Sequence, residues 1–202
     1  MADQNKTNEQ TRALGRSGIE IAPIVFGGNV LGWTADKPRS FELLDHFVAR
    51  GFNTIDTADV YSAWAPGHTG GESEEVLGQW LARRGRRDDI VLMSKVGMME
   101  VRQGLSAANI ETAIEDSLKR LRTDYLDIYF AHIDDQDIPL EETLTGFARV
   151  VESGKVRVIG ASNYSPSACV RLWRYPRQKG CLATKSCNPC ITSMTVMISR
   201  RS

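Results

Sequence analysis

Five short apolar segments recur along the chain at intervals of about 30 to 37 residues, and this spacing restricts the fold more than any other feature of the sequence. The segments are rich in β-branched and aromatic residues, and they occupy positions 24–26, 54–55, 90–93, 126–130 and 156–159. Amphipathic stretches of helical period lie between them, at positions 40–50, 73–83, 106–121 and 141–153. This alternation predicts right-handed βαβ units and a parallel sheet.

Residues suited to helix ends accompany the amphipathic stretches. Ser40, Ser73 and Ser106 stand near the expected starts, where a serine hydroxyl can accept a hydrogen bond from a free backbone N–H group. Gly51 and Gly154 follow the ends of two stretches, where glycine readily adopts the left-handed conformation that terminates a helix.

A parallel sheet of this kind leaves two architectures open, a doubly wound sheet and a (β/α)₈ barrel. Units of about 31 residues are typical of the barrel. No G-x-G-x-x-G pattern follows the first predicted strand, so the dinucleotide-binding fingerprint of the doubly wound fold is missing from the sequence. Residues 14–19, ahead of that strand, predict a small hairpin with a glycine-containing turn.

Polar side chains follow four of the predicted strands at the point where each strand ends. Any one of them alone would more often be structural, as a buried histidine or a packed aromatic residue usually is. The carboxyl ends of parallel strands meet at the same edge of a sheet, so the set together predicts a chemical site there. The residues concerned are Asp56, Tyr61, Lys95, His132, Ser162 and Asn163.

Three separated motifs resemble those of the aldo-keto reductases. The first is GFNTIDTADVY at 51–61 with GESE at 71–74, the second is SLKRL at 117–121 with DYLD at 124–127 and His132, and the third is RVIGASNY at 157–164. The resemblance covers roughly residues 12–166, and the motifs occur in the family's order. It implies a (β/α)₈ TIM barrel, here with only about the first five βα units, that binds NADP(H) across its C-terminal face.

The resemblance also implies a catalytic tetrad of Asp56, Tyr61, Lys95 and His132 that reduces aldehydes and ketones to alcohols. A tyrosine of ordinary pKa, about 10, is a poor acid near neutral pH. We expect Lys95, held by Asp56, to lower the pKa of Tyr61 and stabilise its phenolate. His132 would orient the carbonyl oxygen, while the nicotinamide supplies the hydride.

The remaining implied residues surround this tetrad. Ser162 and Asn163 would hydrogen-bond the nicotinamide carboxamide. Trp33 and Trp64, in loops after the first two strands, would line the substrate pocket, or else serve as ordinary loop anchors. We expect a small carbonyl compound as the substrate and no metal, nucleic acid or membrane partner. The polar first residues show no signal peptide, which favours the cytoplasm. The sequence leaves the oligomeric state open.

The residues after 166 differ from the rest of the chain. Positions 153–202 hold 9 Lys and Arg and no Asp or Glu, whereas positions 1–152 hold 16 Lys and Arg against 25 Asp and Glu. All four cysteines lie in this part, two of them in a C-x-x-C at 187–190 that has no second pair to complete a zinc site. Helical periodicity ends there as well. We therefore divide the chain into 1–166, the N-terminal part of an aldo-keto reductase barrel, and 167–202, an out-of-frame tail.

A shift of reading frame explains the tail. One permitted choice of codons for residues 180–197, read two bases later, gives LPRYKKLQPVHNQYDRH, which resembles a sixth strand of the family. We predict small insertions or deletions near codons 167, 176 and 180. Resequencing of the locus tests this, and an uninterrupted frame with quite different codons would refute it.

Loss of the later strands has a consequence for function. Five strands would leave an open sheet with two unpaired edges, which is a marginal and aggregation-prone arrangement. We expect the chain as written to be weakly stable and inactive by itself, and a micromolar affinity for NADPH would contradict this. Two further interpretations stay open. One is a non-enzymatic regulatory barrel that binds NADP, similar to potassium-channel β-subunits, and the other is an inactive pseudogene product.

Overall fold

The computed structural model describes residues 11–15, 17–179 and 196–199. The strands are β1 (Arg12–Ala13), β2 (Glu20–Ile21), β3 (Val25–Gly27), β4 (Thr54–Asp56), β5 (Val91–Val96), β6 (Leu126–Ala131), β7 (Val156–Ala161) and β8 (Val196–Ser199). The α-helices are α1 (Lys37–Ala49), α2 (Glu72–Arg84), α3 (Ala107–Leu121), α4 (Leu140–Glu152) and α5 (Pro166–Lys179), with 3₁₀ turns at Gly28–Val30 and Glu100–Arg102. No described helix has the length and apolar character needed to span a membrane.

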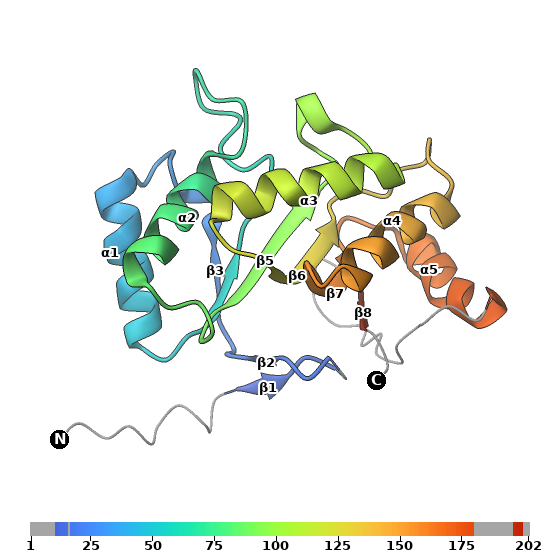
Figure 1. Ribbon diagram of the computed structural model, residues 1–202, viewed down its shortest axis with the longest axis horizontal. Helices are drawn as coiled ribbons and strands as arrows, with labels where there is room; N and C mark the ends of the chain where they lie inside the picture. The colour runs from blue at the N-terminus through green and yellow to red at the C-terminus, as the bar shows by residue number, and fades with distance from the viewer. Residues whose placement is uncertain (1–10, 16, 180–195, 200–202) are drawn as a thin grey trace.

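The main sheet has the order β3-β4-β5-β6-β7-β8, and its first five strands are parallel. Each parallel pair is joined through a helix, so the predicted βαβ units and the five predicted strands are confirmed. Figure 1 shows helices α1 to α4 following one another along one side of the sheet, with the β1–β2 hairpin at the opposite end from the long loops. The predicted hairpin is also confirmed, as an antiparallel pair.

Two apolar cores lie on the two faces of the sheet, because side chains alternate along each strand. Leu92 and Tyr129 belong to the larger core, between the strands and the helices. Val91, Met93 and Phe130 belong to the smaller core on the inner face, where Ile19 of the hairpin packs against them. By this alternation Lys95 shares the inner face with Val91 and Met93, beyond the apolar core.

The predicted helix ends are confirmed in part. Ser106 caps α3 by accepting a hydrogen bond from the N–H of Asn109 at 3.3 Å. Gly51 (φ 84°) and Gly154 (φ 78°) follow the C-caps of α1 and α4 in the left-handed conformation.

The prediction that Ser40 and Ser73 are N-caps is wrong. Helix α1 begins earlier, where Asp36 accepts from the N–H of Arg39, and α2 begins at Glu72. Both serine hydroxyls bind backbone carbonyls instead, Ser40 that of Ala35 at 3.0 Å and Ser73 that of Gly28 at 2.7 Å. These two buried serines hold the helices against preceding segments.

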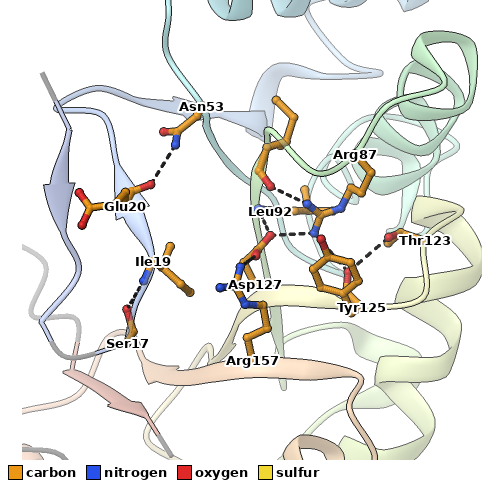
Figure 2. Close-up of polar contacts among 11 residues, drawn as sticks. Ser17, Ile19, Glu20, Asn53, Arg87, Leu92, Thr123, Tyr125, Asp127 and Arg157 are labelled. Carbon is orange, nitrogen blue, oxygen red and sulfur yellow. Dashed lines mark hydrogen bonds and ion pairs between the residues drawn. The ribbon is translucent and has the colours of Figure 1, made fainter. Parts of the chain in front are cut away.

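A cluster around Asp127, drawn in Figure 2, joins three strands near their amino ends, whereas the predicted site lies at their carboxyl ends. The buried carboxylate of Asp127 accepts from the backbone N–H of Leu92 at 2.9 Å, from Arg87 at 2.7 Å and from Arg157 at 2.5 Å. Because these partners belong to β5, the segment before it and β7, one carboxylate on β6 holds both neighbouring strands.

Asn53 fastens the hairpin to the start of β4. Its side-chain amide donates to the carbonyl of Glu20 at 2.9 Å, as Figure 2 shows, and its oxygen accepts from the N–H of Ala22 at 3.0 Å. The hairpin thus covers the inner core at the amino ends of the strands, while the carboxyl ends stay uncovered by it.

One expectation about the tail is wrong. Helical structure does not end at residue 166, since α5 runs from Pro166 to Lys179. Its first turn is capped by the Ser165 hydroxyl, which accepts from the N–H of Ala168 at 3.2 Å, and Ala168, Cys169 and Leu172 form a buried stripe of helical spacing. Strand β8 pairs antiparallel with β7 and so extends the sheet, but it is not a further βα unit, and the predicted five units are confirmed. The C-x-x-C at 187–190 lies outside the described residues.

Candidate active site

The alternation of side chains along β4 and β5 brings the first two predicted residues together. Asp56 ends β4, and Lys95 lies on the neighbouring strand β5. The Nζ atom of Lys95 is 2.7 Å from Oδ2 of Asp56 and donates to the carbonyl of Thr57 at 2.9 Å. Lys95 is only 6% exposed, so its ammonium group depends on these oxygens rather than on water.

Tyr61 joins this pair from the loop that follows β4. Its hydroxyl donates to Oδ2 of Asp56 at 3.1 Å and lies 2.8 Å from Nζ of Lys95. The loop turns tightly here, with the N–H of Tyr61 bound to the carbonyl of Ala58 and Ser62 in the left-handed conformation (φ 73°). A phenol, an ammonium and a carboxylate therefore form a closed hydrogen-bonded triangle.

His132 completes the predicted tetrad from the end of β6. The backbone N–H of His132 donates to the carbonyl of Val96. The centroid of its imidazole ring lies 6.0 Å from the centroid of the Tyr61 ring. Burial and the charge of Lys95 lower the pKa of His132 to about 4, so the imidazole is neutral at pH 7. Its Nδ1 atom is buried with no hydrogen-bond partner among the described residues.

The charge state of the triangle differs from the expectation. Burial raises the pKa of Tyr61 above its ordinary value, and the charge of Asp56 and its hydrogen bond to the phenol raise it further. The prediction of a lowered pKa for Tyr61 is therefore wrong, because burial raises this pKa and the nearby Asp56 carboxylate raises it further. Burial lowers the pKa of Lys95, while Asp56 acts in the opposite direction.

Ser162 and Asn163 follow β7 at the same edge of the sheet. The N–H of Ser162 binds the carbonyl of Ala131, and Asn163 stands in the left-handed conformation (φ 60°). The side-chain amide of Asn163 donates to the carbonyl of His132 at 2.8 Å. Asn163 is thus hydrogen-bonded directly to the backbone of His132.

Two half-exposed tryptophans border the tetrad. Trp33 and Trp64 meet edge to face with ring centroids 5.6 Å apart, and Trp64 lies 6.1 Å from the ring of Tyr61. They are 47% and 49% exposed, which is unusual for large apolar side chains. The structure therefore brings all the loop aromatics predicted from the sequence to one place.

A second group of buried charges, which the sequence reasoning missed, lies behind Lys95. Glu74 of α2 is fully buried and accepts from Ser94 at 2.5 Å and from Arg120 of α3 at 2.7 Å. Helices α2 and α3 approach closely here, since a Cβ atom on Gly78 would lie 2.0 Å from the carbonyl of Arg120. The sequence did contain a signal for the burial of Glu74, because Glu74 precedes the apolar Leu77 by three residues and so lies on the same face of the helix.

Asp59 is the other buried acid missed by the sequence reasoning. It is 1% exposed, and its N–H donates to the backbone carbonyl of Lys95 at 3.2 Å. Burial raises the pKa of Asp59 to about 7, and the charge of Glu74 raises it as well. Among the described residues, no group of three or more His, Cys, Asp or Glu side chains is placed to hold a metal ion.

Comparisons with known proteins agree with this geometry. Residues 23–192 match the family described as "Aldo/keto reductase family". The chain is 61% identical over 87 residues to an uncharacterized 11.2 kDa protein in the crtE 3' region of Pseudescherichia vulneris, an alignment that covers 43% of this chain and 84% of that protein. It is 33% identical over 184 residues to an aryl-alcohol dehydrogenase [NADP(+)] of Phanerodontia chrysosporium, covering 81% of this chain and 46% of that protein.

A solved structure extends the likeness to the fold. The holo form of aldo-keto reductase AKR11C1 from Bacillus halodurans superposes with a TM-score of 0.72 at 32% identity, covering 86% of this chain and 56% of that one. The chain thus spans about half the length of these full-sized relatives, and it holds the first five βα units of their TIM barrel. From its sequence match and from its fold, the chain belongs to the aldo/keto reductase family of oxidoreductases.

Proposed function

We propose that this site reduces the carbonyl group of an aldehyde or ketone to an alcohol, with NADP(H) as the hydride source and Tyr61 as the general acid. The observation that carries the proposal is the partly buried triangle, in which Lys95 lies within 2.8 Å of both the Tyr61 hydroxyl and the Asp56 carboxylate. Carbonyl reduction needs a proton donor at the oxygen that becomes negative, and a phenol beside an ammonium ion meets that need.

The raised pKa of Tyr61 is compatible with this role. A phenol of high pKa stays protonated through the physiological range and so always carries the proton to be donated. As hydride adds to the carbonyl carbon, the carbonyl oxygen becomes basic enough to take that proton. Lys95 then stabilises the phenolate that remains, and Asp56 keeps Lys95 in place.

His132 and Asn163 have separate parts in the proposal. The neutral imidazole of His132 provides one N–H donor, which can orient the substrate oxygen beside Tyr61. Asn163 uses its NH₂ group on the carbonyl of His132, and this leaves its side-chain oxygen as an acceptor for the nicotinamide carboxamide. Ser162 would assist there. These residues fit a nicotinamide cofactor, which supplies the hydride when bound.

Trp33 and Trp64 are proposed to line the substrate pocket. Their exposed faces beside Tyr61 suit a flat, apolar carbonyl compound, since aromatic rings pack edge to face or offset against one another. The aryl-alcohol dehydrogenase named above is compatible with such a substrate. NADP(H) in preference to NADH, and location in the cytoplasm, remain predictions.

The test supplies the rest of the barrel. Residues 1–165 of this chain are joined to the part of the Bacillus halodurans reductase that follows the position equivalent to Ser165, and this chimera is called the completed barrel. We expect it to oxidise NADPH in the presence of 4-nitrobenzaldehyde, as followed by absorbance at the nicotinamide band. The parent reductase is the positive control, and the completed barrel with Lys95→Met is the negative control.

A completed barrel that folds and binds NADPH, yet reduces no aldehyde or ketone that the parent reduces, would overturn the proposal. Folding is judged by circular dichroism and binding by quenching of tryptophan fluorescence. The same assay on the 202-residue chain tests the separate expectation that the chain as written is inactive.

A further inference from the structure

The buried charges around Lys95 do not pair evenly. Two cations, Lys95 and Arg120, lie among three carboxyl groups. Asp56 pairs with Lys95 at 2.7 Å, and Glu74 pairs with Arg120 at 2.7 Å. Asp59 has no ion-pair partner within the described residues, and its buried carboxyl group faces the backbone N–H groups of Val60 and Gly97 rather than a paired cation. A buried carboxylate without a paired cation is costly, so its presence beside Lys95 calls for an explanation.

Asp59 is held in a fixed relation to Lys95 by the backbone. Its N–H donates to the carbonyl of Lys95, and Thr57, two residues earlier, accepts a hydrogen bond from Nζ of Lys95 through its own carbonyl. The segment 57–59 thus lies beside the carboxyl end of β5 and is hydrogen-bonded to it. The side chain of Asp59 interacts electrostatically with Lys95, with Glu74 and with the buried phenol of Tyr129.

We propose that Asp59 is a positioning residue for the proposed carbonyl reduction, whose ionised carboxyl supplies the third negative charge that holds Lys95 as an ammonium ion. The ionised cluster then carries one excess negative charge, and protonation of Asp59 makes it neutral. The role rests on the proposed function, because it matters only if Lys95 stabilises a phenolate at Tyr61.

The charge of Asp59 changes in a useful pH range. Its pKa is raised to about 7, by burial first and by Glu74 second, while Arg120 and the backbone N–H groups of Val60 and Gly97 act in the opposite direction. Above about pH 7, where burial would otherwise favour the neutral amine of Lys95, Asp59 is ionised and opposes the loss of the proton. The titratable and charged groups that surround the pair are Asp56, Tyr61, Glu74, Arg120, Tyr129 and His132.

The test measures the protonation of Lys95 directly in the 202-residue chain. Lysine is labelled with ¹³C at Cε, the Lys95 signal is identified by its loss in Lys95→Met, and its chemical shift is followed against pH. We expect Asp59→Asn to lower the midpoint of the Lys95 titration by about 1 pH unit or more, the size of shift that a nearby opposite charge produces. Asp59→Glu is expected to restore it, and the exposed Asp88→Asn is expected to leave it unchanged.

An unchanged Lys95 midpoint in folded Asp59→Asn would overturn the proposal. If that variant does not fold, the unsubstituted chain decides. Its Lys95 signal should show a second, smaller inflection near pH 7 as Asp59 ionises, and a single inflection would overturn the proposal. The readout needs no turnover, so an inactive completed barrel with a shifted Lys95 midpoint would refute the proposed function and leave this electrostatic coupling standing.

Discussion

Replacement of Tyr61 by phenylalanine should lower the rate of carbonyl reduction by the completed barrel by about 10²- to 10⁴-fold, the range that a general acid contributes. The variant removes one oxygen and keeps the ring, which contacts Trp64 and His132. Lys95 and Asp56 still pair, because their 2.7 Å contact does not pass through the phenol. Single-turnover kinetics with NADPH measure the chemical step. The affinity for NADPH should stay within about twofold of that of the completed barrel without the substitution.

The matched control for this prediction is Tyr125→Phe. Tyr125 lies near the amino end of β6, where its ring stacks under Arg87 with 4.4 Å from the guanidinium carbon to the ring centroid. Tyr125→Phe also removes one phenolic oxygen, but at the end of the sheet away from the tetrad. Reduction should therefore proceed at the rate of the completed barrel without the substitution. Turnover of Tyr61→Phe close to that of Tyr125→Phe would rule out Tyr61 as the proton donor.

Truncation of Asp127 should have the largest effect on stability. Asp127→Ala leaves the N–H of Leu92 without its acceptor and leaves Arg87, whose side chain is 17% exposed, without its counter-ion. Removal of one partner from a buried ion pair costs about 3–5 kcal/mol of unfolding free energy. If the chain is as weakly stable as we expect from its five βα units, this loss should abolish cooperative unfolding, as measured by urea titration with circular dichroism at low temperature.

Two variants place this effect in context. Asp127→Asn keeps an oxygen that can accept from Leu92 and should fall between Ala and the parent. Asp88→Ala removes a carboxylate whose contact with Arg86 lies at the surface, with 79% of the Asp88 side chain exposed, so its urea midpoint should match the parent. Equal midpoints for Asp127→Ala and Asp88→Ala would show that the Asp127 cluster does not brace the sheet.

The strands and helices were largely predictable from the sequence, but two of the three predicted helix starts were wrong. The buried segments recur with a spacing that only strand–helix units satisfy, and the strand at 126–130 extends by just one residue in the structure. Ser40 and Ser73 looked like caps because the preference for serine at helix starts is local. Their hydroxyls in fact bind carbonyls outside the helix, a choice made by tertiary packing that no local rule contains.

The candidate site divides in the same way. That Asp56, Tyr61, Lys95 and His132 lie together could be predicted because each stands at or just after the carboxyl end of a strand, and these ends share one edge; their proposed roles came from the family resemblance. The raised pKa of Tyr61 could not be predicted, since it depends on the burial of the phenol and on its 3.1 Å hydrogen bond to Asp56. Glu74 and Asp59 were missed because a charged residue in a sequence is ordinarily exposed, and only the folded structure shows that both are buried.

The Asp127 cluster and the Lys95 triangle lie at opposite ends of the same strands. Mutations that reshape the loops around the tetrad therefore leave the cross-strand ties at the far end untouched, and the reverse also holds. Natural selection can then vary what the molecule acts on while the framework that holds it together stays the same. In a lineage of such proteins, substrate preference should change faster than thermal stability. The two traits depend on residues at opposite ends of the same strands, which do not contact one another.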